Sequence, residues 1–354
     1  MGVSLAARPP PAPADLPDLV AKCLKQPAVD LVRLAGGLSP RQFFRVGLPD
    51  GGHAIVMWLP EDAPERVLSR RSGRRLPFLE MREILENARV RVPRLLAAAP
   101  EQGLLIVEDL GETLAERIAR DASARATLYR RAVEDLAAAQ RALAELPPDS
   151  IARARAFDRE LLAWEVAHFR EWGIDALGGV LSAEQASAFE RASDFLVSSM
   201  ASFEQGFVHR DYQSRNLMAL PDGSLGWIDF QDALWGPRAY DLVALLCDSY
   251  QAFDEAFVSE RLAEYASVRG LDGEQRERLR YEFDVITVQR KLKDAGRFVF
   301  FERARGDDSY LKYFVPSLRL VLRALSRLPR RPELVGLSSI VQRQVEIGVA
   351  RGML

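Results

Sequence analysis

Cysteine is almost absent from this chain of 354 residues, which contains only Cys23 and Cys247. Two distant cysteines without metal-ligand spacing exclude a disulfide-bonded scaffold and favour a reducing, cytoplasmic setting. An excess of charge is also lacking, because 48 basic and 50 acidic residues give a formal net charge of -2. No apolar run approaches the ~20 residues that a bilayer-spanning helix needs. We therefore expect a cytoplasmic protein without a nucleic-acid or membrane partner.

The N-terminal part of the chain shows a strand-rich pattern after a short tail. Residues 1–13 are rich in Ala and Pro, lack the apolar core of a secretory signal and predict a disordered segment. Short apolar runs separated by turn residues then predict an antiparallel meander. The predicted strands are 31–34, 42–46, 53–59, 92–96 and 104–108, with one helix over about 64–88.

From Thr113 onward the apolar residues recur with helical periodicity. The predicted helices are about 122–146, 157–172, 183–201, 240–248, 254–268, 273–303 and 309–328. We therefore expect an α+β molecule of two lobes. Residues 14–108 would form a small antiparallel sheet plus one helix, 109–112 a hinge, and 113–354 a larger, mostly helical lobe. A cleft between such lobes is where ligands commonly bind.

The most informative motif is the octapeptide 209–216, HRDYQSRN, followed thirteen residues later by Asp229 and Phe230. This spacing is typical of the phosphoryl-transfer site of protein kinases. Asp211 would accept a proton from an attacking hydroxyl, while Asn216 and Asp229 would hold a Mg²⁺ ion against the triphosphate of ATP. Mg²⁺ prefers hard oxygen ligands and keeps several waters, so these two suffice. A chance match in a solvated loop is the alternative, which the predicted strand before Asp229 disfavours.

Further segments complete a pattern around this motif. They are 34–46 (LAGGLSPRQFFRV), 90–93, 105–111, 209–218, 227–237, 240–243 and 289–293, with 157–158, Phe169 and Trp172. With these residues the chain resembles the aminoglycoside-phosphotransferase and choline-kinase branch of the protein-kinase fold over most of its length. Within that branch it is similar to the bacterial anomeric kinases of N-acetylmuramate and N-acetylglucosamine, which serve cell-wall recycling.

The resemblance implies how the two substrates bind. The backbone of the hinge, at Glu108, Asp109 and Leu110, would meet the adenine ring of ATP. The acceptor would be an amino sugar phosphorylated on its C1 hydroxyl. Separately, the sequence shows no sign of an obligate protein partner. The residues alone indicate only a small molecule that carries a hydroxyl. An aminoglycoside, a choline-like or another small alcohol therefore stays open, and so does a non-catalytic nucleotide-binding module.

One cation expected of a kinase is missing. Protein kinases carry a Lys on the third strand that pairs with the phosphates and with a helix Glu, but residues 53–59 contain no Lys or Arg. Arg41 is our candidate replacement, and an ordinary exposed Arg is the alternative. Gly36, Gly37 and Ser39 lie in a turn whose backbone amides could cradle a phosphate, although the full glycine-rich signature is absent.

Five further residues are candidates for contact with the acceptor: Asp232, Trp235, Arg290, Lys291 and Lys293. The three cations lie on one predicted helix, and one of them could bind the lactyl carboxylate of N-acetylmuramate. An exposed helix surface is the alternative. Trp235 could stack on a sugar or belong to the core, and Asp232 could support a metal ligand.

Two residues near the motif are expected to be structural. His209 titrates in the range of a general base, but in the kinase layout it braces the catalytic loop, which is the interpretation we prefer. Asp241 lies at the start of a predicted helix and is expected to cap that helix or anchor the loop.

Overall fold

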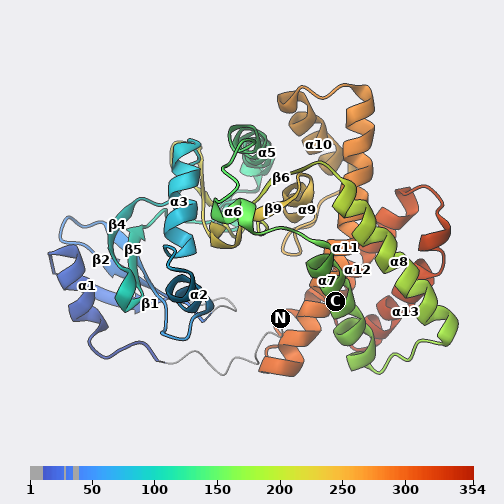
Figure 1. Cartoon of the computed structure of the whole chain (residues 1–354), viewed down its shortest axis with the longest axis horizontal. Coiled ribbons are helices and arrows are strands. Elements are labelled where there is room, and N and C mark those ends of the chain that lie inside the picture. Colours follow the sequence, from blue (N-terminus) through green and yellow to red (C-terminus); the bar gives the residue numbers. More distant parts are fainter. Residues whose placement is uncertain (1–10, 28, 35–39) are drawn as a thin grey trace. The chain divides into compact units, whose positions relative to one another are not determined.

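The computed structural model describes residues 11–27, 29–34 and 40–354, which divide into two compact units (Figure 1). Unit 1 comprises the chain up to Thr113 together with Leu217–Gln231, and unit 2 comprises Leu114–Asn216 and Asp232–Leu354. The chain thus enters unit 1 a second time after Asn216 and leaves it after Gln231. Asp211 and Asp229 consequently belong to different units.

Unit 1 is built on a five-stranded antiparallel sheet with the order β1-β2-β3-β5-β4. Its strands are β1 (Val29–Arg33), β2 (Gln42–Gly47), β3 (His53–Trp58), β4 (Leu95–Ala99) and β5 (Leu104–Glu108). This confirms the predicted small antiparallel sheet. The fourth strand begins at Leu95 rather than at residue 92, because Pro93 has no N–H to donate to a sheet.

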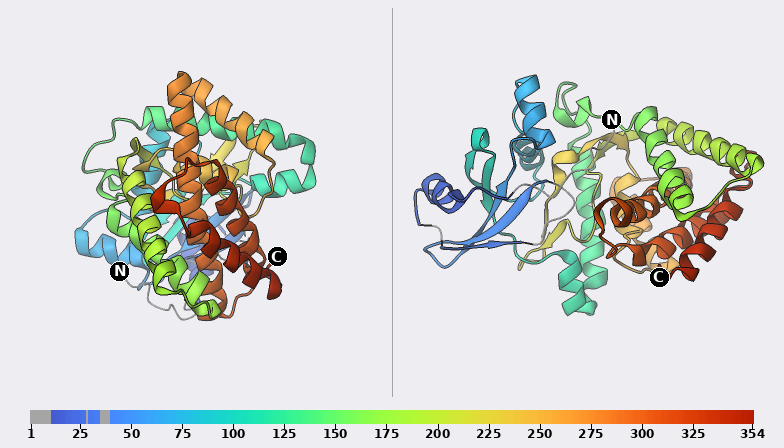
Figure 2. Two further views of the ribbon diagram at one scale, coloured as in Figure 1. Left: turned by 90° about the vertical axis from the view of Figure 1, so that its right-hand side faces the viewer. Right: turned by 90° about the horizontal axis from the view of Figure 1, so that it is seen from below.

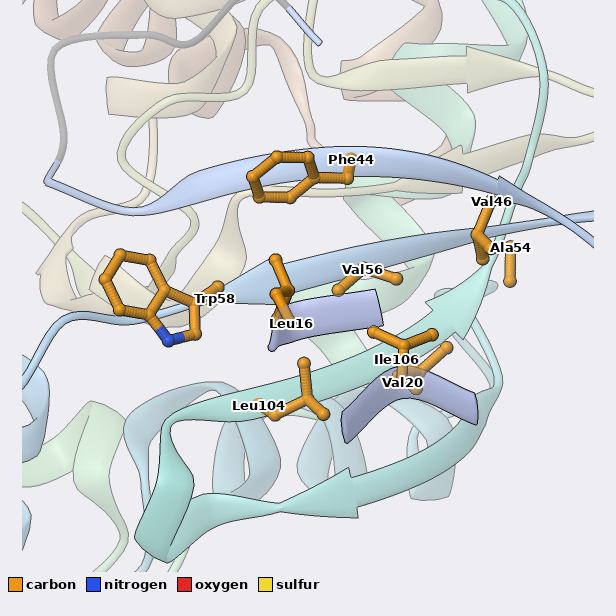
Figure 3. Packing of buried hydrophobic residues seen from close by; sticks show 9 residues of the cluster. All are labelled: Leu16, Val20, Phe44, Val46, Ala54, Val56, Trp58, Leu104 and Ile106. Atoms are coloured by element: carbon orange, nitrogen blue, oxygen red, sulfur yellow. The ribbon is translucent and has the colours of Figure 1, made fainter. Parts of the chain in front are cut away.

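The core of unit 1 lies between the sheet and helix α1 (Leu16–Leu24). Leu16 and Val20 lie one helical turn apart and are 1% and 0% exposed. They pack against sheet residues such as Val56 and Leu104 (Figure 3). Burying each such aliphatic side chain stabilises the fold by about 1.5–3 kcal/mol, so this cluster holds the strands in register.

The single helix predicted over 64–88 is wrong, because the structure has two. Helix α2 (Pro64–Ser72) ends at Gly73, whose φ of 67° is the left-handed conformation that terminates helices. Helix α3 (Pro77–Asn87) then begins with a proline, which favours the first turn of a helix. The break makes α2 a separate helix. The first turn of α2 carries Glu65.

A second, two-stranded sheet in unit 1 leads to Asp229. It pairs β7 (Leu217–Ala219) with β8 (Leu225–Trp227). The N–H of Trp227 donates to the carbonyl of Arg91 at 2.8 Å, which ties this hairpin to the rest of unit 1. Asp229 follows β8 by two residues, so its position is set by backbone hydrogen bonds.

Unit 2 is helical, as predicted, apart from a strand pair formed by β6 (Gln205–Val208) and β9 (Leu234–Pro237). Its α-helices are α4 (Leu114–Arg120), α5 (Arg125–Ala142), α6 (Ile151–Ala154), α7 (Arg159–His168), α8 (Ala183–Ser202), α9 (Tyr240–Leu246), α10 (Glu255–Arg269), α11 (Gly273–Arg305), α12 (Phe314–Arg327) and α13 (Leu337–Ala350). Helix α12 packs along α11, and α13 packs on α12 (Figures 1 and 2). Within the described ranges no helix combines the length and apolarity needed to cross a bilayer.

The helix predicted over 157–172 changes character near its end. After α7, Phe169–Ile174 form a π-helix, η3, a rare conformation that often marks functional sites. Helix α11 approaches this segment closely at Gly296, where an added Cβ would lie 2.8 Å from Phe169 Cα and 2.9 Å from the carbonyl of His168. Only glycine therefore allows α11 to pack this close.

Candidate active site

The predicted catalytic loop, residues 209–216, is anchored at its start by a buried carboxylate. Asp241, in the first turn of α9, is fully buried and accepts hydrogen bonds from the backbone N–H groups of His209 (2.6 Å) and Arg210 (2.9 Å). Burial raises the pKa of Asp241 to about 7, even though both N–H donors favour the ionised form. Asp241 thus anchors the loop rather than facing a ligand.

Two further contacts set the rest of the loop. The hydroxyl and the N–H of Ser214 donate to the buried carboxylate of Asp248 at 2.5 and 3.0 Å. The side-chain amide nitrogen of Asn216 donates to the backbone carbonyl of Asp211 at 2.8 Å. This bond fixes the Asn216 amide so that its oxygen is the atom available to a ligand.

Asp211 lies at the centre of the loop with its side chain 41% exposed, so an acceptor can reach it. Arg290 of α11 lies 3.5 Å from Asp211 Oδ1 and donates to the backbone carbonyl of Arg210 at 2.8 Å. Partial desolvation raises the pKa of Asp211, but the positive charges of Arg290 and Lys293 outweigh it and hold the pKa below its ordinary value. Asp211 is therefore ionised at neutral pH, as a proton acceptor must be.

The backbone at Arg210 adopts a φ of 81°, and Asp229 adopts a φ of 60°. Residues with a side chain rarely occupy this left-handed region, and such strain concentrates at functional sites. Of the two strained positions, Arg210 directly precedes Asp211, and the other is Asp229 itself. The hydrogen bonds around them therefore stabilise a conformation that the local chain disfavours.

Asp229, in unit 1, is held by two donors from the same unit. Its Oδ1 accepts a hydrogen bond from the Gln231 amide at 2.8 Å and lies 3.4 Å from Nη1 of Arg41. The Asp229 side chain is 42% exposed, whereas Arg41 is only 8% exposed. Arg41 also lies 3.0 Å, through Nε, from the carboxylate of Glu65 in α2. The alternative of an ordinary exposed Arg41 is therefore wrong.

The Arg41–Glu65 pair is a feature that was not predicted from the sequence. It reproduces, within unit 1, the pairing of a cation with a helix carboxylate that kinases make from a strand Lys. The sequence does carry a signal for Glu65, because an acidic residue directly follows the proline that begins α2. The predicted phosphate turn at Gly36, Gly37 and Ser39 lies outside the described residues.

The hinge side chains are engaged in ion pairs on unit 1. Glu108 accepts a hydrogen bond from Arg91 at 2.7 Å, and Asp109 accepts one from Arg45 at 2.6 Å. Some desolvation raises the pKa of Glu108, but hydrogen bonds and the charge of Arg91 bring it below its ordinary value. Leu110 is buried. These contacts fix the side chains. A contact between the hinge backbone and adenine stays a prediction.

The three cations predicted to contact the acceptor are buried, so the alternative that they lie on an exposed helix surface is wrong. Arg290 and Lys291 are each 1% exposed and Lys293 is 8% exposed. Lys291 donates to Ser249 at 2.5 Å and to Asp294 at 2.8 Å, and Lys293 lies 3.3 Å from Asp294. We infer that Lys291 is structural, because both of its contacts lie inside the protein.

The other two acceptor candidates lie at the start of the returning chain in unit 2. Trp235 belongs to β9, and the guanidinium of Arg153 lies 4.1 Å from its ring centroid. That contact covers one face of the ring. Asp232 is partly exposed, and its charge contributes to raising the pKa of Arg210. Both roles stay predictions.

A cluster of buried polar residues near Arg210 was also not predicted from the sequence. Glu165 of α7 is 0% exposed, accepts a hydrogen bond from Gln289 at 2.9 Å and lies 3.5 Å from Arg210. His168, one turn later, is 8% exposed. Burial and the nearby charges of Arg297 and Lys293 lower the pKa of His168 to about 4. Its imidazole is therefore neutral at physiological pH.

This lowered pKa predicts an acid-sensitive fold. A histidine that stays neutral in the folded state stabilises it fully above pH 6.5, and this contribution is lost as the pH falls towards 4. The shift corresponds to about 3 kcal/mol. The measurement is the free energy of unfolding in urea at pH 7, 5.5 and 4.5. As the pH falls, this free energy should decrease less for His168→Phe than for the unchanged protein. The control is His53→Gln, at an exposed position of β3, and equal slopes for His168→Phe and the unchanged protein would contradict the prediction.

A strand-rich unit, a helical unit and an H-R-D-x-x-x-x-N loop set on a buried Asp define a small-molecule kinase of the protein-kinase-like fold. The chain belongs to the phosphotransferase enzyme family, whose model matches residues 30–281.

Relatives with known names agree with this assignment. The chain is 32% identical over 312 residues to an N-acetylmuramate/N-acetylglucosamine kinase of Neisseria meningitidis, covering 85% of this chain and 86% of the relative. Among solved structures, the gentamicin–APH(2")-IIa complex matches with a TM-score of 0.61 and 14% identity, over 92% of this chain and 99% of that one. Choline kinase LicA from Streptococcus pneumoniae matches with a TM-score of 0.58 and 15% identity, over 87% and 98%. These two structures share the fold.

Proposed function

We propose that the protein transfers the γ-phosphoryl group of ATP to the C1 hydroxyl of N-acetylmuramate or N-acetylglucosamine in cell-wall recycling. The observation that carries the proposal is the ionised, reachable carboxylate of Asp211 beside Arg290 in the catalytic loop. The named relatives support the choice of an amino sugar. ATP is supplied in the cytoplasm, where we expect the protein to act.

In this mechanism Asp211 holds and then deprotonates the acceptor. Its carboxylate accepts a hydrogen bond from the C1 hydroxyl and takes the proton as the sugar oxygen forms a bond to the γ-phosphorus. The bond between that phosphorus and the bridging oxygen of ADP breaks at the same centre. Arg290 holds the carboxylate in place and keeps it ionised before the transfer.

On the donor side, Arg41 would pair with a phosphate group while Glu65 holds its guanidinium. Asn216 and Asp229 would hold Mg²⁺, which, when bound, neutralises charge on the phosphates. The residues fit this ion, because the Asn216 amide presents its oxygen and Asp229 is an accessible carboxylate. Over the described part of the chain no three His, Cys, Asp or Glu residues gather as a metal site of their own. A nucleotide that supplies further oxygen ligands accounts for such a sparse set.

The test is ADP release with four acceptors: N-acetylmuramate, N-acetylglucosamine, choline and gentamicin. Either amino sugar should raise ADP release at least about 100-fold above the rate without acceptor, since positioning and base catalysis both require a bound hydroxyl. Choline and gentamicin should leave the background rate unchanged. Turnover of choline or gentamicin alone would replace the proposed acceptor. ATP binding without turnover of any acceptor would indicate a non-catalytic nucleotide-binding module.

A further inference from the structure

Arg297 of α11 is a cation without an anionic partner in the described part of the chain. It is partly buried, and no carboxylate in the described ranges forms an ion pair with it. Its guanidinium carbon lies 5.3 Å from the centroid of the Phe301 ring. Desolvation lowers the pKa of Arg297, and the opposing charges of Asp211 and Glu165 do not restore it. A guanidinium in this state gains from a bound anion.

Arg297 lies on α11, the helix that also carries Arg290, the partner of Asp211. It follows Lys293 by one helical turn and comes directly after Gly296, the residue at which α11 touches the π-helix. Helices α7 and α11 pack against each other in unit 2 (Figure 1). The charge of Arg297 acts on Asp211 and on His168, so all three belong to one electrostatic neighbourhood.

The same neighbourhood carries partly exposed aromatic rings. Trp164 stacks on His168 with ring centroids 5.4 Å apart, and Trp172 meets Phe300 edge to face at 5.0 Å. Trp164, Trp172 and Phe300 are each partly exposed. Aromatic faces suit the C–H faces of a pyranose ring, and small-molecule sites combine such walls with a few polar groups.

Buried polar atoms in this region also lack a partner. Within the described residues, His168 Nε2 and Gln289 Oε1 make no hydrogen bond, whereas Glu165 Oε1 lies 3.5 Å from Arg210. Buried polar atoms are nearly always hydrogen-bonded, so each such exception points to a missing ligand or water. Rings, polar atoms and an unpaired cation together describe a site for a polar, anionic small molecule.

We propose that Arg297 binds a carboxylate of the acceptor and thereby selects N-acetylmuramate over N-acetylglucosamine. The inference rests on the proposed function. The two sugars differ by a lactyl ether, whose carboxylate is the group that a guanidinium binds through paired N–H donors. The cations suggested by the sequence are already occupied, since Arg290 lies against Asp211 while Lys291 and Lys293 pair with Asp294.

The test compares both sugars with Arg297→Gln. The variant should lose about 10- to 100-fold in kcat/KM for N-acetylmuramate, mainly through a higher KM, because a charge-assisted contact is lost. Its kcat/KM for N-acetylglucosamine should change by less than about threefold. Arg297→Lys, which keeps the charge, should recover part of the loss. Arg303→Gln is the matched control, because Arg303 lies on the same helix, is 45% exposed and pairs with Glu302.

A second arm changes the sugar in place of the protein. The methyl ester of N-acetylmuramate removes the negative charge, so the unchanged protein should use it about 10- to 100-fold less well than the acid. Arg297→Gln should not distinguish ester from acid. Equal losses on both sugars, or equal use of acid and ester by the unchanged protein, would overturn the role of Arg297. Turnover of neither sugar by the unchanged protein would overturn the proposed function itself and, with it, this inference.

Discussion

Replacing Asp211 by Asn is expected to lower kcat by about 100- to 10,000-fold while ATP binding stays unchanged. The amide has nearly the same shape as the carboxylate and can still lie against Arg290, but it cannot take the proton of the C1 hydroxyl. Because the Asp211 side chain is 41% exposed and the loop is anchored through Asp241 and Asp248, the fold should tolerate the change. The measurements are steady-state phosphoryl transfer and nucleotide titration on the same preparation.

Asp194→Asn is the matched control, because Asp194 is an exposed carboxylate on α8 of the same unit. It should keep full activity. Retention of more than about a tenth of the wild-type kcat by Asp211→Asn would show that another group accepts the proton.

Replacing Asp229 by Asn is expected to lower kcat by about 100- to 1,000-fold, because a metal ion bound through this carboxylate supplies several kcal/mol of charge stabilisation. The variant should also need a higher Mg²⁺ concentration for half-maximal activity. The amide keeps an acceptor for Gln231 but loses the charge that faces Arg41. Activity measured against Mg²⁺ concentration separates a lost metal ligand from a general loss of rate.

Glu65→Gln helps to distinguish the two roles of the Asp229 carboxylate. It weakens the hold on Arg41 without removing a metal ligand, so it should raise the KM for ATP and leave the Mg²⁺ requirement nearly unchanged. An Mg²⁺ requirement that is the same for Asp229→Asn and for the unchanged protein would contradict the metal-ligand role. Asp222→Asn, in the exposed turn before β8, is the control in unit 1.

The parts of the fold that local pattern controls could be predicted. Strand β5 has the same bounds as its prediction, and β2 and β3 differ by one residue at one end. Their runs of apolar and β-branched residues are bounded by turn residues, which is a local signal. The break between α2 and α3 was also local, at Gly73 and Pro77, but helical periodicity on both sides concealed it.

The features that depend on long-range packing could not be predicted. Glu65 of α2 pairs with Arg41, which precedes β2, and the π-helix lies where Gly296 lets α11 approach closely. Burial of three cations on one helix is likewise a tertiary effect, since their charges are balanced by groups such as Asp294. Arg297, on the same helix, is only partly buried and makes no ion pair with a described carboxylate, which a sequence does not show.

The proposed function depends most on Asn216 and Asp229 both binding the cation that accompanies ATP. A crystal structure with a non-hydrolysable ATP analogue, an amino sugar and Mn²⁺ in place of Mg²⁺ tests this claim most directly. Anomalous scattering should place the ion within bonding distance of both side chains, with Asp211 hydrogen-bonded to the C1 hydroxyl. An ion bound by only one of the two residues, or a sugar remote from Asp211, would contradict the account.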